Sequence, residues 1–304
     1  IRCLDMIDWY ILMAGVILLS GIGSIIEKRT LFKEHAMEFS AVFSILIFLF
    51  SLPLIPYLNL TFSSSFWLPL YLLSIILSVA FLFVAKASRH MELSSSSPLF
   101  AFGPVITAGL AWPFLKESLT SVQLGGIGLI FLGSYLLEMK PKKSFIQELG
   151  TPFKTIIKSK YIHFMLFAIF LYAVSATITR FFLNTSNPLH IEPITLLFII
   201  NMFVAFNLFV LISIFHDGYS GIMHGIHSAG GWIALMALVL LANRLLLSYV
   251  MAIPSAKIAL VIAFRRTSLI ISTFFGGKLF HDKHLSQKTF AAMVMVLGAI
   301  ILVI

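Results

Sequence analysis

Long runs of apolar residues recur along the chain and are separated by short polar segments. A helix of about 20 residues, rising about 1.5 Å per residue, matches a hydrocarbon core of about 30 Å. Lipid offers no hydrogen-bonding partner, so the backbone of such a run must pair within its own helix. The pattern predicts ten membrane-spanning helices, over residues 9–26, 38–58, 66–88, 97–115, 120–138, 161–183, 193–215, 230–251, 256–275 and 287–304.

The ten predicted spans fall into two groups of five. We expect a first five-helix repeat over residues 1–140, a basic linker over 141–160 and a second repeat over 161–304. A short charged turn at Glu117 or Asp282 precedes the last span of each group, and aligning these two acids also aligns Gly133 with Gly298. Because five is odd, the second repeat would enter the membrane inverted, an arrangement typical of transporters with alternating access.

Composition supports a membrane protein rather than a soluble one. Hydrophobic residues make up 60% of the chain and charged residues only 11%, whereas soluble domains carry about 25% charged residues. The net charge of +9 comes mostly from residues at span ends, which predicts contact with anionic lipid rather than with nucleic acid. Glu27, Lys28 and Arg29 follow the first span where a cleavage site would need small residues, so we expect that span to be retained.

Several segments resemble a known family. Residues 97–104, 114–119 and 123–133, and again 266–268, 276–280, Asp282 and Gly298, are similar to the EamA-like family of the drug/metabolite transporter superfamily. The resemblance implies an all-α integral membrane protein with ten transmembrane helices in two inverted five-helix repeats. It also implies a central cavity lined by helices one, three, four, six, eight and nine, and a small metabolite as substrate. The family usually has Glu where this chain has Asp282.

The distribution of short-loop lysines and arginines predicts the orientation of the chain. One set of connections holds Lys28, Arg29, Lys33, Lys86, Arg89, six lysines of 139–160, Lys278, Lys283 and Lys288, and the opposite set holds Arg2, Lys116, Arg180 and Lys257. This count favours both termini outside. The family resemblance implies cytoplasmic termini, so the two arguments disagree.

Three arginines lie inside predicted spans: Arg244, Arg265 and Arg266. An Arg at a helix centre costs about 2.5–3.5 kcal/mol on insertion scales, so each should face the bundle interior or water. One hypothesis is that they attract an anionic group of the substrate. The other is a structural lock, in which each guanidinium binds carbonyls or a carboxylate of a neighbouring helix.

Polar stripes at helical spacing add further candidate residues. Arg265, Ser268 and Ser272 form one stripe, and similar stripes run through the first, third and sixth spans. The predicted substrate-binding residues are Arg244, Arg265, Arg266, Ser268, Ser272, Asn243, Ser20, Ser24, Ser175 and Thr179. The alternative for each Ser and Thr is a hydrogen bond to its own helix, which small residues at packed interfaces commonly make.

Acidic and metal-binding residues are sparse. Glu27 is the single candidate for coupling transport to an ion, because the other acids lie further toward span ends. The histidines at 216, 224 and 227 lie in a segment, 216–229, that we interpret as a polar loop, and they lack the regular spacing of metal ligands. We predict no metal site, no cofactor and no catalytic residue.

These observations favour a secondary transporter of the cell membrane, an exporter or importer that moves a small polar or amphipathic metabolite by alternating access. Its partners would be the substrate and the lipid bilayer. The alternative is a membrane-embedded enzyme or binding protein acting on a lipid or polyprenyl phosphate, in which the arginines would hold phosphate.

Overall fold

The computed structural model describes residues 2–31, 36–90, 99–100, 102–138, 160–215, 218–271 and 285–303. These residues form helices and short turns, with no strand among them. The elements are α1 (Arg2–Leu31), α2 (Ala36–Ser51), η1 (Leu52–Tyr57), η2 (Ser64–Phe66), α3 (Trp67–His90), α5 (Phe102–Leu115), α6 (Ser121–Glu138), α8 (Lys160–Leu183), α9 (Pro193–Phe215), α10 (Gly218–Ala252), α11 (Ile258–Arg266) and α13 (Leu285–Val303). The predicted all-helical class is confirmed for this part of the chain.

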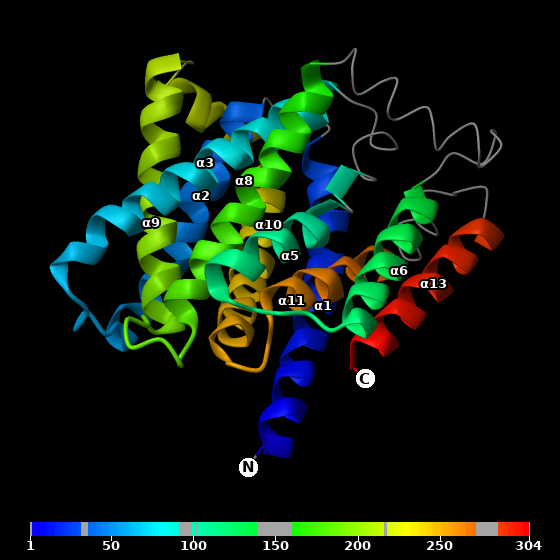
Figure 1. Ribbon diagram of the computed structural model, residues 1–304. Coiled ribbons are helices and arrows are strands. Elements are labelled where there is room, and N and C mark those ends of the chain that lie inside the picture. Colours follow the sequence, from blue (N-terminus) through cyan, green and yellow to red (C-terminus); the bar gives the residue numbers. More distant parts are fainter. Residues whose placement is uncertain are drawn as a thin grey trace.

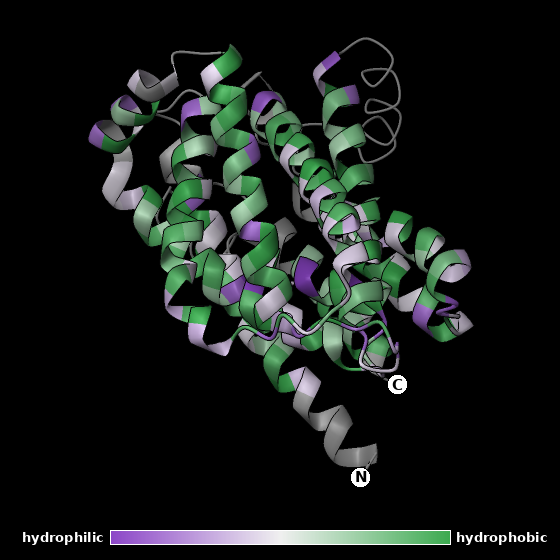
Figure 2. Ribbon diagram, turned by 90° about the vertical axis from the view of Figure 1, so that its left-hand side faces the viewer, coloured by the Kyte–Doolittle hydropathy of each residue, from purple (hydrophilic) through white to green (hydrophobic). Residues whose placement is uncertain are grey.

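Among the residues that the structure describes, six helical segments are long and apolar enough to cross a membrane, and three shorter apolar helices accompany them. Large hydrophobic side chains such as Trp112, Phe114 and Phe215 are about 70% exposed on the outside of the bundle. Figure 2 shows that hydrophobic residues predominate along most of the helices. Such a surface suits lipid tails, which need no polar partner.

The second and the ninth predicted spans differ from the prediction in the structure. The second span ends as an α-helix at Ser51 and continues as the 3-10 helix η1, because Pro53 and Pro56 cannot donate the backbone hydrogen bonds of a regular α-helix. The ninth span, predicted as continuous over 256–275, is interrupted at Thr267: helix α11 ends at Arg266, the Thr267 hydroxyl donates to the Phe264 carbonyl in a turn, and residues 268–271 are helical again. Residues 272–284 lie outside the described part.

The interpretation of 216–229 as a loop is wrong for residues 218–229, which the structure describes. Helix α10 begins at Gly218 and contains 35 residues, a length of about 52 Å that exceeds the hydrocarbon core. Its first turns persist because they pack on α2: Ile222 is buried, and a Cβ at Gly225 would lie 3.2 Å from Val42 Cγ2. The polar composition of this segment therefore marks a helix that leaves the bilayer.

The helices pack in pairs that join the two halves of the chain. Helix α1 packs on α10, and α3 packs on α8; α2 contacts both α9 and α10, and α9 also contacts α3. Helix α5 contacts α8 and α11, and α6 packs along α13 at one side of the bundle (Figure 1). Both chain ends lie at the bottom of the bundle in Figure 1. We call that end the lower face; it carries the turns 58–63, 116–120, 184–192 and 253–257.

Glycines allow α6 and α13 to approach closely. A Cβ at Gly133 would lie 2.9 Å from the Ala291 carbonyl oxygen, and one at Gly298 would lie 2.9 Å from the Gly126 carbonyl oxygen. The predicted alignment of Gly133 with Gly298 thus falls on one helix interface. Lipid supplies no hydrophobic force between helices, so this pair depends on close van der Waals contact that small residues permit.

We predict that Gly133→Ala destabilises the protein by about 1–3 kcal/mol, because the added methyl group must displace backbone of α13. The measurement is the thermal unfolding midpoint of the purified protein. Gly128→Ala on the same helix is the matched control, since a Cβ there would meet nothing within 4 Å. Equal midpoints for both variants would contradict the close packing.

Candidate functional site

Polar side chains from five helices gather in the middle of the bundle. We call this group the central cluster; its members are Ser20 and Glu27 of α1, Tyr172 of α8, Asn201 of α9, Asn243 and Arg244 of α10 and Arg265 of α11. Hydrogen bonds or electrostatic interactions link every member to another. Side chains far apart in the sequence therefore meet at one place between the two halves of the chain.

Ser20 is the point at which three helices meet. Its Oγ accepts hydrogen bonds from Asn243 Nδ2 at 2.9 Å and from Arg265 Nε at 3.3 Å. Asn243 Nδ2 also donates to the Val16 carbonyl at 2.8 Å. Because that carbonyl can only accept, it fixes the orientation of the Asn243 amide. These bonds hold the guanidinium of Arg265 beside α1.

Arg244 follows Asn243 on α10, about 100° further round the helix, and reaches α9. Its Nη1 donates to Asn201 Oδ1 at 3.1 Å. Its charge and that of Arg265 act on one another, and both act on the hydroxyl of Tyr172. The two arginines of the cluster thus share one region, although they bind different helices.

The arginines of the central cluster retain unused donors. A guanidinium carries five N–H groups, whereas Arg244 and Arg265 each donate one side-chain hydrogen bond among the described residues. Within that part of the chain, the buried side-chain nitrogen and oxygen atoms without a partner are Asn201 Nδ2 and Asn243 Oδ1. The free terminal nitrogens of the two arginines are not among them, so these nitrogens contact space that a water molecule can enter.

Glu27 brings the acidic group of the cluster. It is half-buried and lies two turns beyond Ser20 on the same face of α1. Its charge acts on Arg265 and on Tyr172, yet it forms no direct ion pair within the described residues. The Glu27 carboxylate and the Arg265 guanidinium therefore lie near a common region but do not form an ion pair with each other.

The structure separates Arg266 from Arg265, as expected for neighbours about 100° apart on a helix. Arg266 stacks over the ring of Phe100 at 5.3 Å from its centroid, and its Nη2 would lie 3.1 Å from a Cβ at Gly103. It thus points toward α5, although its charge still acts on that of Arg265. A cation over an aromatic face is stabilised by the ring quadrupole.

The predicted Ser and Thr residues divide into different environments. Ser24 and Ser175 donate to carbonyls of their own helices, at Gly21 and Tyr172. Thr179 is half-buried on α8, and Ser268 is buried just after the Thr267 turn. Ser272 lies outside the described residues.

Two asparagines of α9 were missed by the sequence interpretation. Asn201 contacts Arg244, and Asn207 donates to Ser74 and Ser78 of α3 at 3.0 and 3.5 Å. Both are buried. The signal was present, because an amide inside an otherwise apolar span needs a partner that lipid cannot supply.

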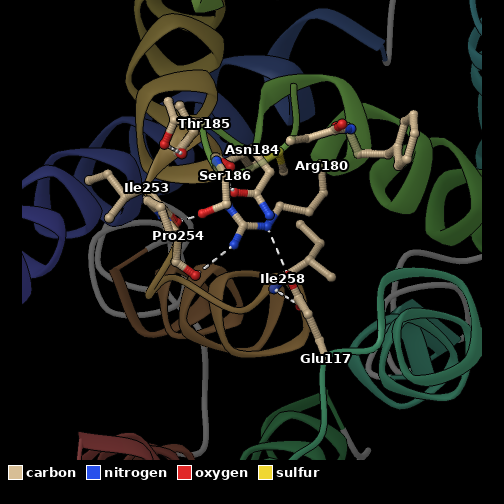
Figure 3. A network of polar contacts seen from close by, with 12 residues as sticks. Glu117, Arg180, Asn184, Thr185, Ser186, Ile253, Pro254 and Ile258 are labelled. Atoms are coloured by element: carbon tan, nitrogen blue, oxygen red, sulfur yellow. Dashed lines mark hydrogen bonds and ion pairs between the residues drawn. The ribbon is translucent and has the colours of Figure 1, made fainter. Parts of the chain in front are cut away.

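A second polar network lies at the lower face and centres on Arg180 (Figure 3). Arg180 is only 1% exposed, and its Nε forms an ion pair with Glu117 Oε1 at 2.9 Å. Its terminal nitrogens donate to the carbonyls of Met251, Ile253 and Pro254. Every nitrogen of this guanidinium therefore has a protein acceptor.

Glu117 continues the network into α11. Its Oε2 accepts a hydrogen bond from the Ile258 backbone N–H at 2.8 Å, at the first residue of that helix. Lys257 donates to the Ser118 carbonyl and to Gln123 Oε1. Elsewhere on this face, the Asn59 backbone N–H donates to Thr195 Oγ1, and the Asn59 side-chain Nδ2 donates to Glu192 Oε1. The turns of the two halves are thus bonded together at the lower face.

An open pocket at the start of α10 is lined by Glu38, Ser220, Gly221 and His224. Glu38 pairs with His224 Nδ1 at 3.1 Å. No group of three or more His, Cys, Asp or Glu side chains placed to hold a metal ion occurs in the part of the chain that the structure describes.

We predict that Arg180→Gln destabilises the protein by about 3–5 kcal/mol, because the change leaves the Glu117 carboxylate buried without its charged partner. The thermal unfolding midpoint in detergent measures the effect. Lys257→Gln is the matched control at the same face and should cost less than about 1 kcal/mol, since its contacts are more exposed. An Arg180→Gln variant as stable as the parent would contradict a locking role.

Comparison with known proteins places the chain in a family. The EamA-like transporter family matches residues 7–139. An uncharacterized protein of Methanocaldococcus jannaschii is 32% identical over 120 residues, which is 39% of this chain and 88% of that protein. A protein of known crystal structure shares the fold, with a TM-score of 0.71 and 12% identity, over 97% of this chain and 96% of that one. The predicted resemblance is confirmed: the chain is a multi-pass membrane protein of the EamA-like transporter family.

Proposed function

We propose that this protein is a secondary transporter that moves a small polar or amphipathic metabolite by alternating access, and that it is not an enzyme. The observation that carries the proposal is the central cluster, in which Arg244 and Arg265 keep donors that water can reach in the middle of a membrane bundle. Substrate-binding residues of this kind belong near the bilayer midplane in transporters built from repeats.

The packing of the helices supports two inverted five-helix repeats, over 1–140 and 161–304. In chain order, α1, α2, α3, α5 and α6 of the first half correspond to α8, α9, α10, α11 and α13 of the second half. If each helix is replaced by its counterpart, the α1–α10 contact becomes the α8–α3 contact, and the α2–α10 contact becomes the α9–α3 contact. The α2–α9, α5–α11 and α6–α13 contacts each convert into themselves. A twofold relation between the halves accounts for all of these pairs. The proposed linker 141–160 falls outside the described residues, apart from Lys160.

The lower-face network supplies the closed gate that alternating access needs. Arg180 of the second half and Glu117 of the first half join the turns around them while the central cluster remains reachable to water. In our proposal these contacts break when the halves rock, and the cluster then opens to the other side. Glu27, which forms no ion pair with another described residue, is the proposed site of ion coupling.

The inverted arrangement predicts that Leu60 and Ser220 face opposite compartments. Both are exposed, and Ser220 lies near the start of α10. Single cysteines at 60 and 220, placed in a Cys3→Ser background, should react with a membrane-impermeant thiol reagent from opposite sides of oriented vesicles. Labelling of both from the same side would overturn the inverted repeats.

Alternating access predicts that a cysteine at Ser24, on the same face of α1 as Ser20 and Glu27, reacts with an impermeant reagent from either side of the membrane. Glu117→Gln should increase the rate from the lower-face side, because it weakens the Arg180 contact. Labelling rates in vesicles of both orientations measure this, and Ser213→Ala serves as the control, because Ser213 is exposed, bonds only its own helix and lies at the far end of α9 from the lower face. Reaction from one side only, in every variant, would favour a static receptor or an enzyme pocket.

A further inference from the structure

The central cluster holds more positive than negative charge. Arg244 and Arg265 face Glu27 and Tyr172, so two cations share one carboxylate among the charged members. Two acids outside the cluster have partners of their own: Glu117 binds Arg180, and Glu38 contacts His224. An unbalanced charge in the bilayer interior is costly unless water or a counter-ion reaches it.

The two arginines repel one another, and each is oriented by a neutral side chain. Arg265 is held by Ser20 and Arg244 by Asn201, and the charge of Arg265 acts on Arg244. Neutral partners fix the position of a guanidinium without cancelling its charge. This differs from Arg180, whose nitrogens are all taken by a carboxylate and by backbone carbonyls.

The free donors of the cluster match the acceptors of an anion. Guanidinium nitrogens bind carboxylate and phosphate oxygens through short charge-assisted hydrogen bonds. The Tyr172 hydroxyl has no hydrogen-bond partner in the described part of the chain and is absent from the buried unpartnered atoms, so it can donate as well. A cationic cargo would meet two like charges and only one carboxylate.

We propose that the cargo carries a carboxylate or phosphate group that binds between Arg244 and Arg265, and that this group balances the charge which Glu27 leaves uncompensated. The inference rests on the proposed function, since it assigns the substrate class of the same site. A cargo that also carries an ammonium group would place it toward Glu27, which faces the same region.

The test uses the purified full chain and five matched probes with one aromatic skeleton: 3-phenylpropionate, phenyl phosphate, phenylalanine, 3-phenylpropionamide and phenethylamine. An aliphatic set of the same five head groups covers smaller cargo. Thermal unfolding midpoints are measured at equal probe concentration and ionic strength. We expect stabilisation only from probes with an anionic group, because a ligand that prefers the folded state raises its stability. The carboxylate and phosphate members distinguish the two kinds of anion.

Arg244→Gln and Arg265→Gln should weaken the binding of the stabilising probe by about tenfold or more, as loss of a charge-assisted hydrogen bond predicts. Arg266→Gln is the matched control, because Arg266 points to Phe100, and its affinity should stay close to the parent value. Without probe, both cluster variants should melt near the parent temperature. A fall in that temperature comparable to that of Arg180→Gln would overturn the binding role in favour of a structural lock.

Three further results would overturn the inference: stabilisation by the amide or the amine alone, undiminished binding of the anionic probe by both Gln variants, or no stabilisation by any probe. None of these bears on the labelling at Ser24, which tests transport without any ligand. A failure of the substrate class is therefore distinguishable from a failure of the proposed function.

Discussion

A guanidinium inside a bilayer must either find protein acceptors for its donors or stay in contact with water, and this constraint separates the arginines of the bundle. Arg180 meets it with four acceptors: Glu117 and three backbone carbonyls. Arg244 and Arg265 each have a single acceptor among the described residues. The first arrangement closes a face of the molecule, and the second leaves a polar site inside it.

The closing arrangement also uses the partial charges of helix ends. Carbonyls at the end of α10 are negative and point to Arg180, while Glu117 accepts the N–H of Ile258 at the positive start of α11. The negative end of α10, the Arg180 cation, the Glu117 carboxylate and the positive start of α11 thus follow one another, and this series connects both halves of the chain. Removing one member exposes the next as an unpaired group, so the network should form and break as a unit.

The helices were predictable from sequence because hydropathy reports the demand of the bilayer directly. Features that depend on individual side-chain contacts could not be predicted from hydropathy. The start of α10 has a polar composition, and only its packing of Gly225 on Val42 explains the helix. Arg180 was counted as a loop charge because it lies at a span end, where hydropathy carries no information on burial. The turn at Thr267 depends on local hydrogen bonds that periodicity does not contain.

The fold and the charges obey different symmetries. Helix packing is consistent with exchange of the two halves, whereas Arg244 and Arg265 both belong to the second half and Glu27 and Ser20 to the first. In the proposed mechanism, rocking of one half against the other would therefore move the guanidinium groups relative to the carboxylate. The proposed anion between the arginines would stay with the second half, and its distance from Glu27 would change with the state of the bundle. Such a change in Coulomb energy, in a medium of low dielectric constant, provides a physical means by which binding of cargo can favour one state over the other.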